Sequence, residues 1–291
     1  MDQGFEITTV PTSAYLHSPT PTSSPASSEP GLASYDIILA NSSAGKDSQA
    51  MLDYLAERCR ALGILDRLAV AHADLGRVEW PGTPELAEEH ARHYGLRFFR
   101  VRRQQGDLLH QVEQRGKWPG PKTRYCTSDH KRAQVQRVMT ALVRKLREDG
   151  LRRPVRILNC MGHRAQESPK RAQMQGFEHD QSASNGRRWV DIWRPLHAWT
   201  EPQVWARIRQ AGTRVHWAYS LGMPRLSCCF CIYAPRDALI LAGHHNRELL
   251  SEYVRVEQKI GHHFKHRLPI ASIQTAVERG EQGTPIQSWC M

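Results

Sequence analysis

The sequence predicts an α/β protein with an open, doubly wound parallel sheet of about five strands. Five short apolar runs are typical of strands, and they span 35–40, 68–74, 98–101, 155–160 and 189–193. Between these runs apolar residues recur at helical spacing, most regularly over 135–146. Strands that alternate with helices pair in parallel, and the helices cover both faces of the sheet. Ligands of such folds bind at the carboxyl ends of the strands.

The chain has 291 residues, which is long enough to bury a large core, and its composition divides it into three predicted parts. Residues 1–33 are rich in Ser, Thr and Pro. We expect a disordered tail there because these residues offer little apolar surface to bury. Residues 34–215 form the predicted α/β domain, and residues 216–291 form a Cys-containing, mainly helical C-terminal cap.

The net charge of +11 favours polyanionic partners such as nucleic acid or nucleotides, although a solvated basic face fits the charge equally well. The sequence has no run of about 18 apolar residues, and its N-terminus lacks the pattern of a secretory signal. We therefore expect a cytoplasmic protein without a membrane span or a membrane partner. Seven cysteines in such a chain favour reactive thiols or metal ligands over disulfides.

A turn of small residues, 42–48, joins the first predicted strand to a helix. A helix N-terminus carries unpaired backbone N–H groups and a partial positive charge, so it attracts anions such as phosphate. The candidate phosphate-binding residues of this turn are Ser42, Ser43, Gly45, Lys46 and Ser48. Asp47 would repel a phosphate unless a cation lay between them, and we interpret it as a Mg²⁺ ligand. The turn is not a Walker A loop, because the first glycine is missing. An ordinary turn is the alternative.

A basic loop, 162–171, follows the predicted strand at 155–160 and reaches the same edge of the sheet. Arg164 and Arg171 suit the α-phosphate and the departing pyrophosphate of a nucleotide, because guanidinium groups bind phosphate oxygens in a bidentate manner. We expect Glu167 to orient one of these arginines rather than to act as a base. A surface loop with an ordinary ion pair is the alternative.

Four motifs, Ser42–Ser48, Arg124–Lys131, Gly162–Arg171 and Leu196–Thr200, occur in the order found in the PAPS reductase-like family. Over about residues 35–235 the chain resembles this family of the adenine nucleotide α-hydrolase (PP-loop ATP pyrophosphatase) superfamily. In character it is most similar to the DNA phosphorothioation-type sulfurtransferases. The resemblance implies a nucleotide-binding α/β domain that holds ATP at the carboxyl edge of five parallel strands. It also implies that Gly162 lies in the nucleotide site, that Lys131 contacts the phosphate or sulfate end, and that Asp74 lies near the adenosine pocket.

Cys228 and Cys231 form a Cys-x2-Cys pair, which lets two thiolates bind one metal centre. Iron–sulfur members of the family have such a pair and also an earlier cysteine pair, of which this chain keeps Cys126. The resemblance therefore implies a [4Fe–4S] cluster, with Cys160 as the first candidate for the fourth ligand and Cys229 as the second. A Zn²⁺ site and a redox-active dithiol are the alternatives.

The family includes two kinds of chemistry, and the C-terminus helps to choose between them. Its reductases attack a sulfate with the cysteine of a C-terminal Glu-Cys-Gly-Leu-His, whereas this chain has Cys290 without those neighbours. We therefore favour cleavage of ATP to AMP and pyrophosphate, with Mg²⁺, to adenylate a nucleic acid for sulfur insertion. DNA is favoured over tRNA, and a sulfur donor such as a cysteine desulfurase is the implied partner. The alternatives are a PAPS or APS reductase and a nucleotide- or nucleic-acid-binding module without turnover.

Overall fold

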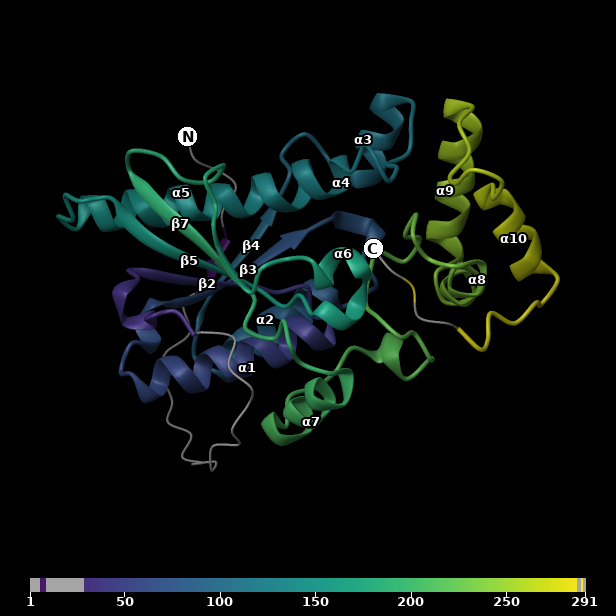
Figure 1. The fold of residues 1–291 in the computed structure, drawn as a ribbon. Coiled ribbons are helices and arrows are strands. Elements are labelled where there is room, and N and C mark those ends of the chain that lie inside the picture. The colour runs from purple at the N-terminus through teal and green to yellow at the C-terminus, as the bar shows by residue number, and fades with distance from the viewer. Residues whose placement is uncertain (1–5, 9–28, 287–288, 290–291) are drawn as a thin grey trace. The chain divides into compact units, whose positions relative to one another are not determined.

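The computed structural model describes residues 6–8, 29–286 and 289 (Figure 1). Its strands are β1 (Glu6–Thr8), β2 (Ile37–Asn41), β3 (Leu68–Asp74), β4 (Arg97–Arg102), β5 (Val155–Met161), β6 (Phe177–His179) and β7 (Arg188–Trp193). Its helices are α1 (Lys46–Ala61), α2 (Thr83–His93), α3 (Leu108–Arg115), α4 (Tyr125–Thr127), α5 (Ala133–Glu148), α6 (Pro169–Ala172), α7 (Glu201–Ala211), α8 (Arg236–His245), α9 (Arg247–Ile260) and α10 (Ile270–Glu278). A π-helical turn, η4 (Ser128–Arg132), joins α4 to α5.

The strands form one sheet in the order β1-β4-β3-β2-β5-β7-β6. Strand β2 pairs in parallel with β3 and with β5, and β5 pairs in parallel with β7. The predicted α/β fold with an open, mostly parallel sheet is therefore confirmed, and the five predicted strands correspond to β2, β3, β4, β5 and β7. The sequence does not predict the two strands of three residues, which are both antiparallel. Strand β1 pairs with β4, and β6 pairs with β7.

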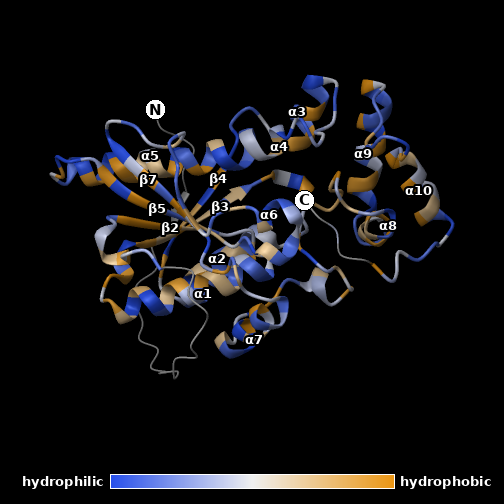
Figure 2. Cartoon of the chain, in the orientation of Figure 1, coloured by the Kyte–Doolittle hydropathy of each residue, from blue (hydrophilic) through white to orange (hydrophobic). Residues whose placement is uncertain are grey.

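Helices cover both faces of the sheet (Figure 1). Helix α5 covers one face, where its Val138 belongs to the same buried cluster as Ile37 and Leu39 of β2. Side chains alternate along a strand, so Ile38 and Ala40 point to the opposite face, on the side of α1 and α2. Figure 2 shows that β2 and β5 are hydrophobic along most of their length, as expected for strands buried on both faces.

The described residues belong to two compact units, each built from three stretches of the chain. The first draws on Met1–His72, Pro84–Val101 and Val135–Arg214, and it contains most of the sheet. The second draws on Ala73–Thr83, Arg102–Gln134 and Val215–Met291. The sequence analysis divides the chain into consecutive parts with a boundary after residue 215. The structure differs because two earlier stretches pack with the C-terminal helices.

The second unit has a hydrophobic core of its own, formed by α3, α8, α9 and α10. Trp118 stacks on Tyr253 with the ring centroids 5.2 Å apart. The buried carboxylate of Glu257 accepts hydrogen bonds from the backbone N–H groups of Phe264 at 2.6 Å and of Ile270 at 3.0 Å. Because Ile270 is the first residue of α10, Glu257 satisfies N–H groups that a helix N-terminus leaves unpaired.

Most of the predicted N-terminal tail, residues 1–5 and 9–28, lies outside the described residues. Residues 6–8 form β1, and Glu29 accepts a hydrogen bond from Arg58 of α1 at 3.0 Å. The α/β unit therefore includes residues that the sequence analysis assigns to the tail. Among the helices of the described ranges, none is long and apolar enough to cross a membrane.

Candidate active site

The turn between β2 and α1 is folded by its own serine side chains. The Ser42 hydroxyl accepts from the Ala44 N–H at 3.2 Å. The Ser48 hydroxyl accepts from the Ser43 N–H at 3.1 Å and donates to the Gly45 carbonyl at 2.9 Å. Ala44 has φ of +55°, a left-handed conformation that a small residue tolerates within a tight turn. Ser42 and Ser48 thus hold the turn closed, a role that the sequence analysis does not foresee.

The first turn of α1 presents backbone N–H groups and a buried cation. Gly45 precedes the helix, and no side chain caps this end through a hydrogen bond. The Lys46 side chain is only 4% exposed, and its Nζ lies 3.6 Å from Asp47 Oδ2 and 3.8 Å from Glu201 Oε1. An uncapped N-terminus next to a buried lysine has the chemistry of an anion site.

Arg164 supplies a second buried cation at the same place. Its side chain is 2% exposed, and Nε donates to Asp47 Oδ1 at 2.5 Å. One guanidinium nitrogen donates to Gln166 Oε1 at 2.8 Å, and the other lies 3.9 Å from Glu201 Oε2. Two buried cations therefore face two carboxylates, and the opposite charges offset the cost of taking each group out of water.

Gly162 allows the basic loop to approach the first turn of α1. A Cβ atom at this position would lie 2.9 Å from the carbonyl carbon and oxygen of Asp47 and 3.0 Å from the Ser48 nitrogen. Backbone atoms cannot move aside as the end of a flexible side chain can. Only glycine therefore fits here without displacing α1.

The rest of the basic loop is fixed by Glu167 and by the motif at 196–200. Glu167 forms an ion pair with Arg171 and also accepts from the Arg164 backbone N–H at 2.9 Å. The His197 carbonyl accepts from the Ala165 N–H at 2.8 Å, and His197 Nε2 lies 2.9 Å from the Arg171 carbonyl oxygen. Glu167 thus contacts both arginines of the predicted phosphate site, as expected of an orienting residue.

The second unit contains Asp74, Lys131 and, among the described residues, Cys126, Cys228, Cys229 and Cys231. Asp74, the last residue of β3, is 2% exposed; its Oδ1 accepts from the Gly76 N–H at 2.7 Å, and its Oδ2 lies 3.8 Å from Arg102 Nε. These contacts fix the turn after β3. The predicted place of Asp74 beside adenosine stays a prediction.

Cys126, Cys228 and Cys231 lie near one another and near Lys131. Burial raises the pKa of the Cys228 and Cys231 thiols, whereas the charge of Lys131 lowers the pKa of both. A Cys126 thiolate would raise the pKa of both thiols further, which places it in the same group. Three soft sulfur donors in one place suit iron or zinc. Within the described ranges, however, no group of three or more His, Cys, Asp or Glu residues has an arrangement that could hold a metal ion.

Cys160 has different surroundings from this group, whereas Cys229 adjoins it with Cys228 as a charged neighbour. Cys160 lies on β5 with 0% exposure, and its Sγ points to the Leu158 carbonyl oxygen at 3.9 Å. Burial raises the pKa of the Cys160 thiol, and a negative charge on the nearby Cys59 would raise it further. Cys229 is 1% exposed, and burial raises the pKa of its thiol as well. The predicted role of Cys160 as the fourth metal ligand stays a prediction.

Comparison with known families decides the classification. The family model described as the phosphoadenosine phosphosulfate reductase domain matches residues 37–234, which is well over half of the chain. The chain belongs to this family. The match begins at β2 and ends just beyond the cysteine group, so it includes both candidate sites. The family predicted from the four sequence motifs is therefore confirmed.

The relatives of this family member include one protein from a bacteriophage. A curated relative, the uncharacterized 37.8 kDa protein in the gpa 5′ region of Escherichia phage 186, is 29% identical over 126 residues, which is 43% of this chain and 34% of the phage protein. The alignment thus spans about a third of the phage protein.

Similar solved structures include phosphoadenylyl-sulfate reductase from Candida auris in a phosphate complex, with 17% identity and a TM-score of 0.45 over 68% of this chain and 84% of that one. Yeast FAD synthetase in complex with FAD has 12% identity and a TM-score of 0.44, over 76% of this chain and 72% of the synthetase chain. The U34-tRNA thiolase NcsA from Methanococcus maripaludis with its [4Fe–4S] cluster has 14% identity and a TM-score of 0.40, over 85% of this chain and 72% of the thiolase chain.

Glu201 and Gln166 belong to the candidate phosphate site of this family member, and sequence reasoning missed both. Glu201 is the first residue of α7, and the sequence assigns it only to the start of that helix. Its N–H donates to Gln166 Oε1 at 2.8 Å, and its carboxylate reaches Lys46 and Arg164. Arg207 of α7 pairs with acidic residues of α1 and so holds α7 against α1. No local pattern marks Glu201, because its partners come from distant motifs.

His130, in the motif at 124–131, is expected to make this family member sensitive to acid. It is fully buried, and its Nε2 donates to Gln111 Oε1 at 2.8 Å. Burial lowers the pKa of His130 from 6.5 to about 4. The unfolded chain therefore takes up a proton near pH 6.5 that the folded protein does not accept until pH falls to about 4. Stability is unaffected by this group above pH 7 and decreases by about 3 kcal/mol between pH 6.5 and 4.

This expectation is checked by urea unfolding of wild type and His130→Asn at pH 7, 6, 5 and 4. The variant is expected to be less stable at pH 7 but to lose less of its unfolding free energy as pH falls. His263→Asn, at an exposed position of the same unit, is the matched control and keeps the pH dependence of wild type. Equal pH dependence of His130→Asn and wild type would show that His130 does not cause the acid sensitivity.

Proposed function

We propose that this protein binds ATP at the candidate phosphate site and cleaves it to AMP and pyrophosphate while it adenylates a nucleic acid for sulfur insertion. We favour DNA as the nucleic acid. The observation that carries this proposal is the pair of buried cations, Lys46 and Arg164, beside the uncapped N-terminus of α1. Burying a cation is costly, and a site with two of them beside the N-terminus of a helix is suited to a highly charged anion.

The residues of the site have separate roles in the proposed reaction. An oxygen of the acceptor attacks the α-phosphorus of ATP, the bond to the β-phosphate oxygen breaks, and pyrophosphate leaves. The N–H groups of α1 and Lys46 would hold the departing pyrophosphate. Arg164 and Arg171 would stabilise the charge that develops at the α-phosphate. Hydrosulfide then displaces AMP, so that sulfur replaces the attacking oxygen.

Asp47 is the residue that would hold Mg²⁺, which neutralises phosphate charge when it is bound. A carboxylate next to a helix N-terminus fits a hard cation that prefers oxygen ligands. In the present arrangement Asp47 accepts from Arg164 and lies near Lys46. A cation at Asp47 would weaken both contacts and leave the two positive side chains able to turn to phosphate oxygens.

The cysteine group would supply the sulfur chemistry. Cys126, Cys228 and Cys231 would hold a [4Fe–4S] cluster only after their thiols move together, because their present arrangement could not hold a metal ion. Such a cluster provides sulfur or electron transfer when it is bound. Zn²⁺ is the alternative metal for the same thiols. Lys131, beside these thiols, favours their deprotonated and metal-binding form because its positive charge lowers their pKa.

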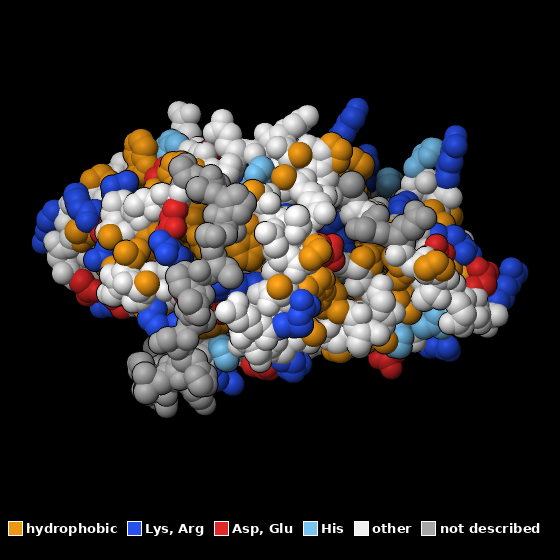
Figure 3. Space-filling model, turned by 60° about the horizontal axis from the view of Figure 1, so that its bottom comes forward, with side chains coloured by type: hydrophobic (Ala, Val, Ile, Leu, Met, Phe, Trp, Pro, Cys, Tyr) orange, Lys and Arg blue, Asp and Glu red, His pale blue; other side chains and the backbone are white. Residues whose placement is uncertain are grey.

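The proposed nucleic-acid acceptor is supported by the charge of +11. Figure 3 shows Lys and Arg side chains scattered among hydrophobic and uncharged ones on the face that it draws. Scattered charge attracts a polyanion without selecting its sequence. A cysteine desulfurase would deliver the sulfur as a persulfide, and a thiol reductant would release it as hydrosulfide while the thiols are oxidised to a disulfide.

The proposal is tested by incubating the anaerobically purified protein with ATP, Mg²⁺, sodium sulfide and either duplex DNA or tRNA. Mass spectrometry after nuclease digestion then measures sulfur incorporation. We expect phosphorothioate in DNA only when ATP is present, and background levels for Lys46→Ala. Lys145→Ala, at an exposed lysine of α5 that pairs with Asp149, is the matched control and retains activity. Sulfur in tRNA alone would contradict the choice of DNA, and no ATP-dependent sulfur in either would contradict the nucleic-acid acceptor.

Reduction of a sulfonucleotide is the second candidate, because the family that this chain matches is described by that activity. Cys290, the cysteine that would attack sulfur, lies outside the described residues, but its neighbour Trp289 is buried and accepts from Arg225 at 2.8 Å through its carbonyl oxygen. A reductase would release sulfite from PAPS or APS with a thiol reductant, and Cys290→Ser would abolish that release. Under our proposal Cys290→Ser leaves AMP formation unchanged. A binding module without turnover would bind ATP and leave it intact.

A further inference from the structure

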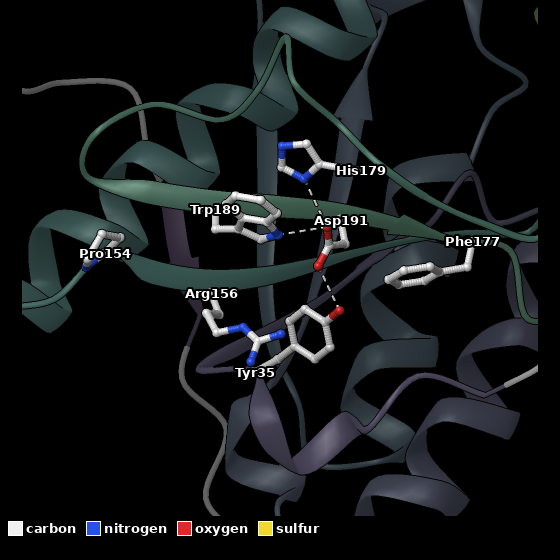
Figure 4. A pocket seen from close by; sticks show the side chains of 7 residues that line it. All are labelled: Tyr35, Pro154, Arg156, Phe177, His179, Trp189 and Asp191. Atoms are coloured by element: carbon white, nitrogen blue, oxygen red, sulfur yellow. Dashed lines mark hydrogen bonds and ion pairs between the residues drawn. The ribbon is translucent and has the colours of Figure 1, made fainter.

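The first unit carries a groove that the proposed reaction does not use. This groove, of about 610 Å³, is lined chiefly by Tyr35, Arg156, Phe177, His179, Trp189 and Asp191 (Figure 4). It lies on the sheet face opposite α5, because Arg156 and Trp189 alternate with the residues of β5 and β7 that pack in the α5 cluster.

The part of the groove that contains Trp189 is at the opposite end of the strands from the phosphate site. Arg156 is the second residue of β5, Trp189 is the second residue of β7, and Tyr35 lies just before β2. The turn at 42–48 and the loop at 162–171 follow the carboxyl ends of β2 and β5. Since these strands are parallel, Tyr35, Arg156 and Trp189 lie near their amino ends, whereas Phe177 pairs with Trp193 at the carboxyl end of β7.

Asp191 holds the aromatic rings of the groove in fixed positions. Its carboxylate is 5% exposed and accepts from the Tyr35 hydroxyl at 2.8 Å, from Trp189 Nε1 at 2.9 Å and from His179 Nδ1 at 3.0 Å. A buried carboxylate is stable only when it is hydrogen-bonded, and here the donors come from three rings. Figure 4 shows these bonds converging on Asp191 from three separate segments. The rings are therefore ordered before any ligand arrives.

Two of the aromatic side chains that line the groove are exposed to solvent, one bonded to Asp191 and one not. Trp189 is 49% exposed and Phe177 is 38% exposed, and they lie on either side of Asp191 in Figure 4. The His179 ring lies against Trp189 with the centroids 3.9 Å apart. Exposed flat rings that are held rigidly form a surface on which a planar ligand stacks at little cost in conformational entropy.

The charged residues around the groove favour an anion. Asp36 is paired through both oxygens with Arg153 at 2.7 Å, so its charge is already neutralised. Arg156 is exposed, with its guanidinium carbon 5.0 Å from the centroid of the Tyr35 ring. Arg187 is exposed and lies in the turn just before β7, two residues before Trp189. A planar ligand with a negative charge beside it therefore matches this groove.

We propose that the groove binds unpaired bases of single-stranded DNA. A base would stack on Trp189, while Arg156 and Arg187 contact the flanking phosphates. Aromatic platforms bordered by basic residues bind single strands in this manner, because every base has a flat apolar face. The choice of DNA over RNA rests on the proposed function, whereas base stacking in the groove does not.

The proposal is tested by fluorescence anisotropy of labelled 20-residue oligothymidylate with the full-length protein. Loss of a stacked base weakens binding by roughly 5- to 150-fold, so this range is expected for Trp189→Ala. Trp189→Phe is expected to retain most of the affinity, which separates stacking from a folding defect. Leu62→Ala is the matched control, because Leu62 is 47% exposed and lies at the end of α1. A plot of the logarithm of the binding constant against the logarithm of the salt concentration measures the phosphate contacts. Arg156→Ala and Arg187→Ala are each expected to make the slope of this plot shallower by about 0.7.

The outcomes separate this proposal from the proposed reaction. ATP cleavage by Trp189→Ala in the absence of nucleic acid is expected to match that of wild type. Wild-type affinity of Trp189→Ala for the oligonucleotide would overturn base stacking, whatever the protein does to ATP. Equal binding of a duplex of the same length would overturn the requirement for unpaired bases. Tight binding of single-stranded RNA without binding of DNA would overturn the choice of ligand.

Discussion

Replacing Arg164 with alanine is expected to slow AMP and pyrophosphate formation by about 10²- to 10³-fold, the usual effect of removing one group that stabilises developing charge. Arg164 is 2% exposed and contacts both Asp47 and Glu201, so water cannot replace its charge easily. Its removal also leaves Asp47 next to the phosphates without its closest cation. The larger part of the loss is expected in kcat, because charge on the leaving group grows in the transition state.

Initial rates of AMP formation at saturating ATP measure this effect. Arg164→Lys keeps the charge but loses the planar fork, so its activity should lie between that of Arg164→Ala and wild type. Arg92→Ala, in an exposed ion pair with Glu88 on α2, is the matched control and should behave as wild type. If Arg164→Ala keeps wild-type kcat with an unchanged melting temperature, Arg164 has no part in the reaction.

Gly162→Ala is expected to disrupt the phosphate site by steric displacement. The added Cβ would lie within 3.0 Å of backbone atoms of both Asp47 and Ser48, in the first turn of α1. Overpacking of this kind costs about 1–3 kcal/mol of stability. Because the displaced atoms belong to the proposed pyrophosphate site, ATP affinity is expected to fall at least about 10-fold, which corresponds to 1.4 kcal/mol.

Thermal unfolding and ATP titration of the variant test this expectation together. Gly186→Ala is the matched control, since its added Cβ would meet nothing within 4 Å and it lies in the turn before β7. A lower melting temperature with intact ATP affinity would show that Gly162 supports the fold alone. Wild-type values for both quantities would contradict the close approach of the two loops.

Much of the fold could be predicted because its main strands are continuous apolar runs. The runs at 35–40 and 155–160 became β2 and β5, which are neighbours at the centre of the sheet. The strands β1 and β6 could not be predicted, because three residues such as Phe177–His179 are too few to show an alternating pattern. The second unit also escaped prediction, since composition does not reveal which loops pack with the C-terminal helices.

The sequence predicts those residues of the candidate phosphate site that come directly after a strand. Lys46 and Arg164 follow β2 and β5, so the parallel pairing of these strands brings them together. Glu201 was missed because it reaches the site from the N-terminus of α7. Cys160 was proposed as a metal ligand from its place in the sequence, and the alternation of β5 directs it into a fully buried layer. Asp191 was missed because its three ring partners come from three separate segments.

The most direct measurement of the central claim is product analysis with α-labelled ATP, Mg²⁺ and anaerobically purified protein, with and without DNA. Our account predicts AMP and pyrophosphate in equal amounts, stimulation by DNA, and loss of both products in Asp47→Ala. ADP with phosphate, or intact ATP from folded protein in every condition, would contradict it.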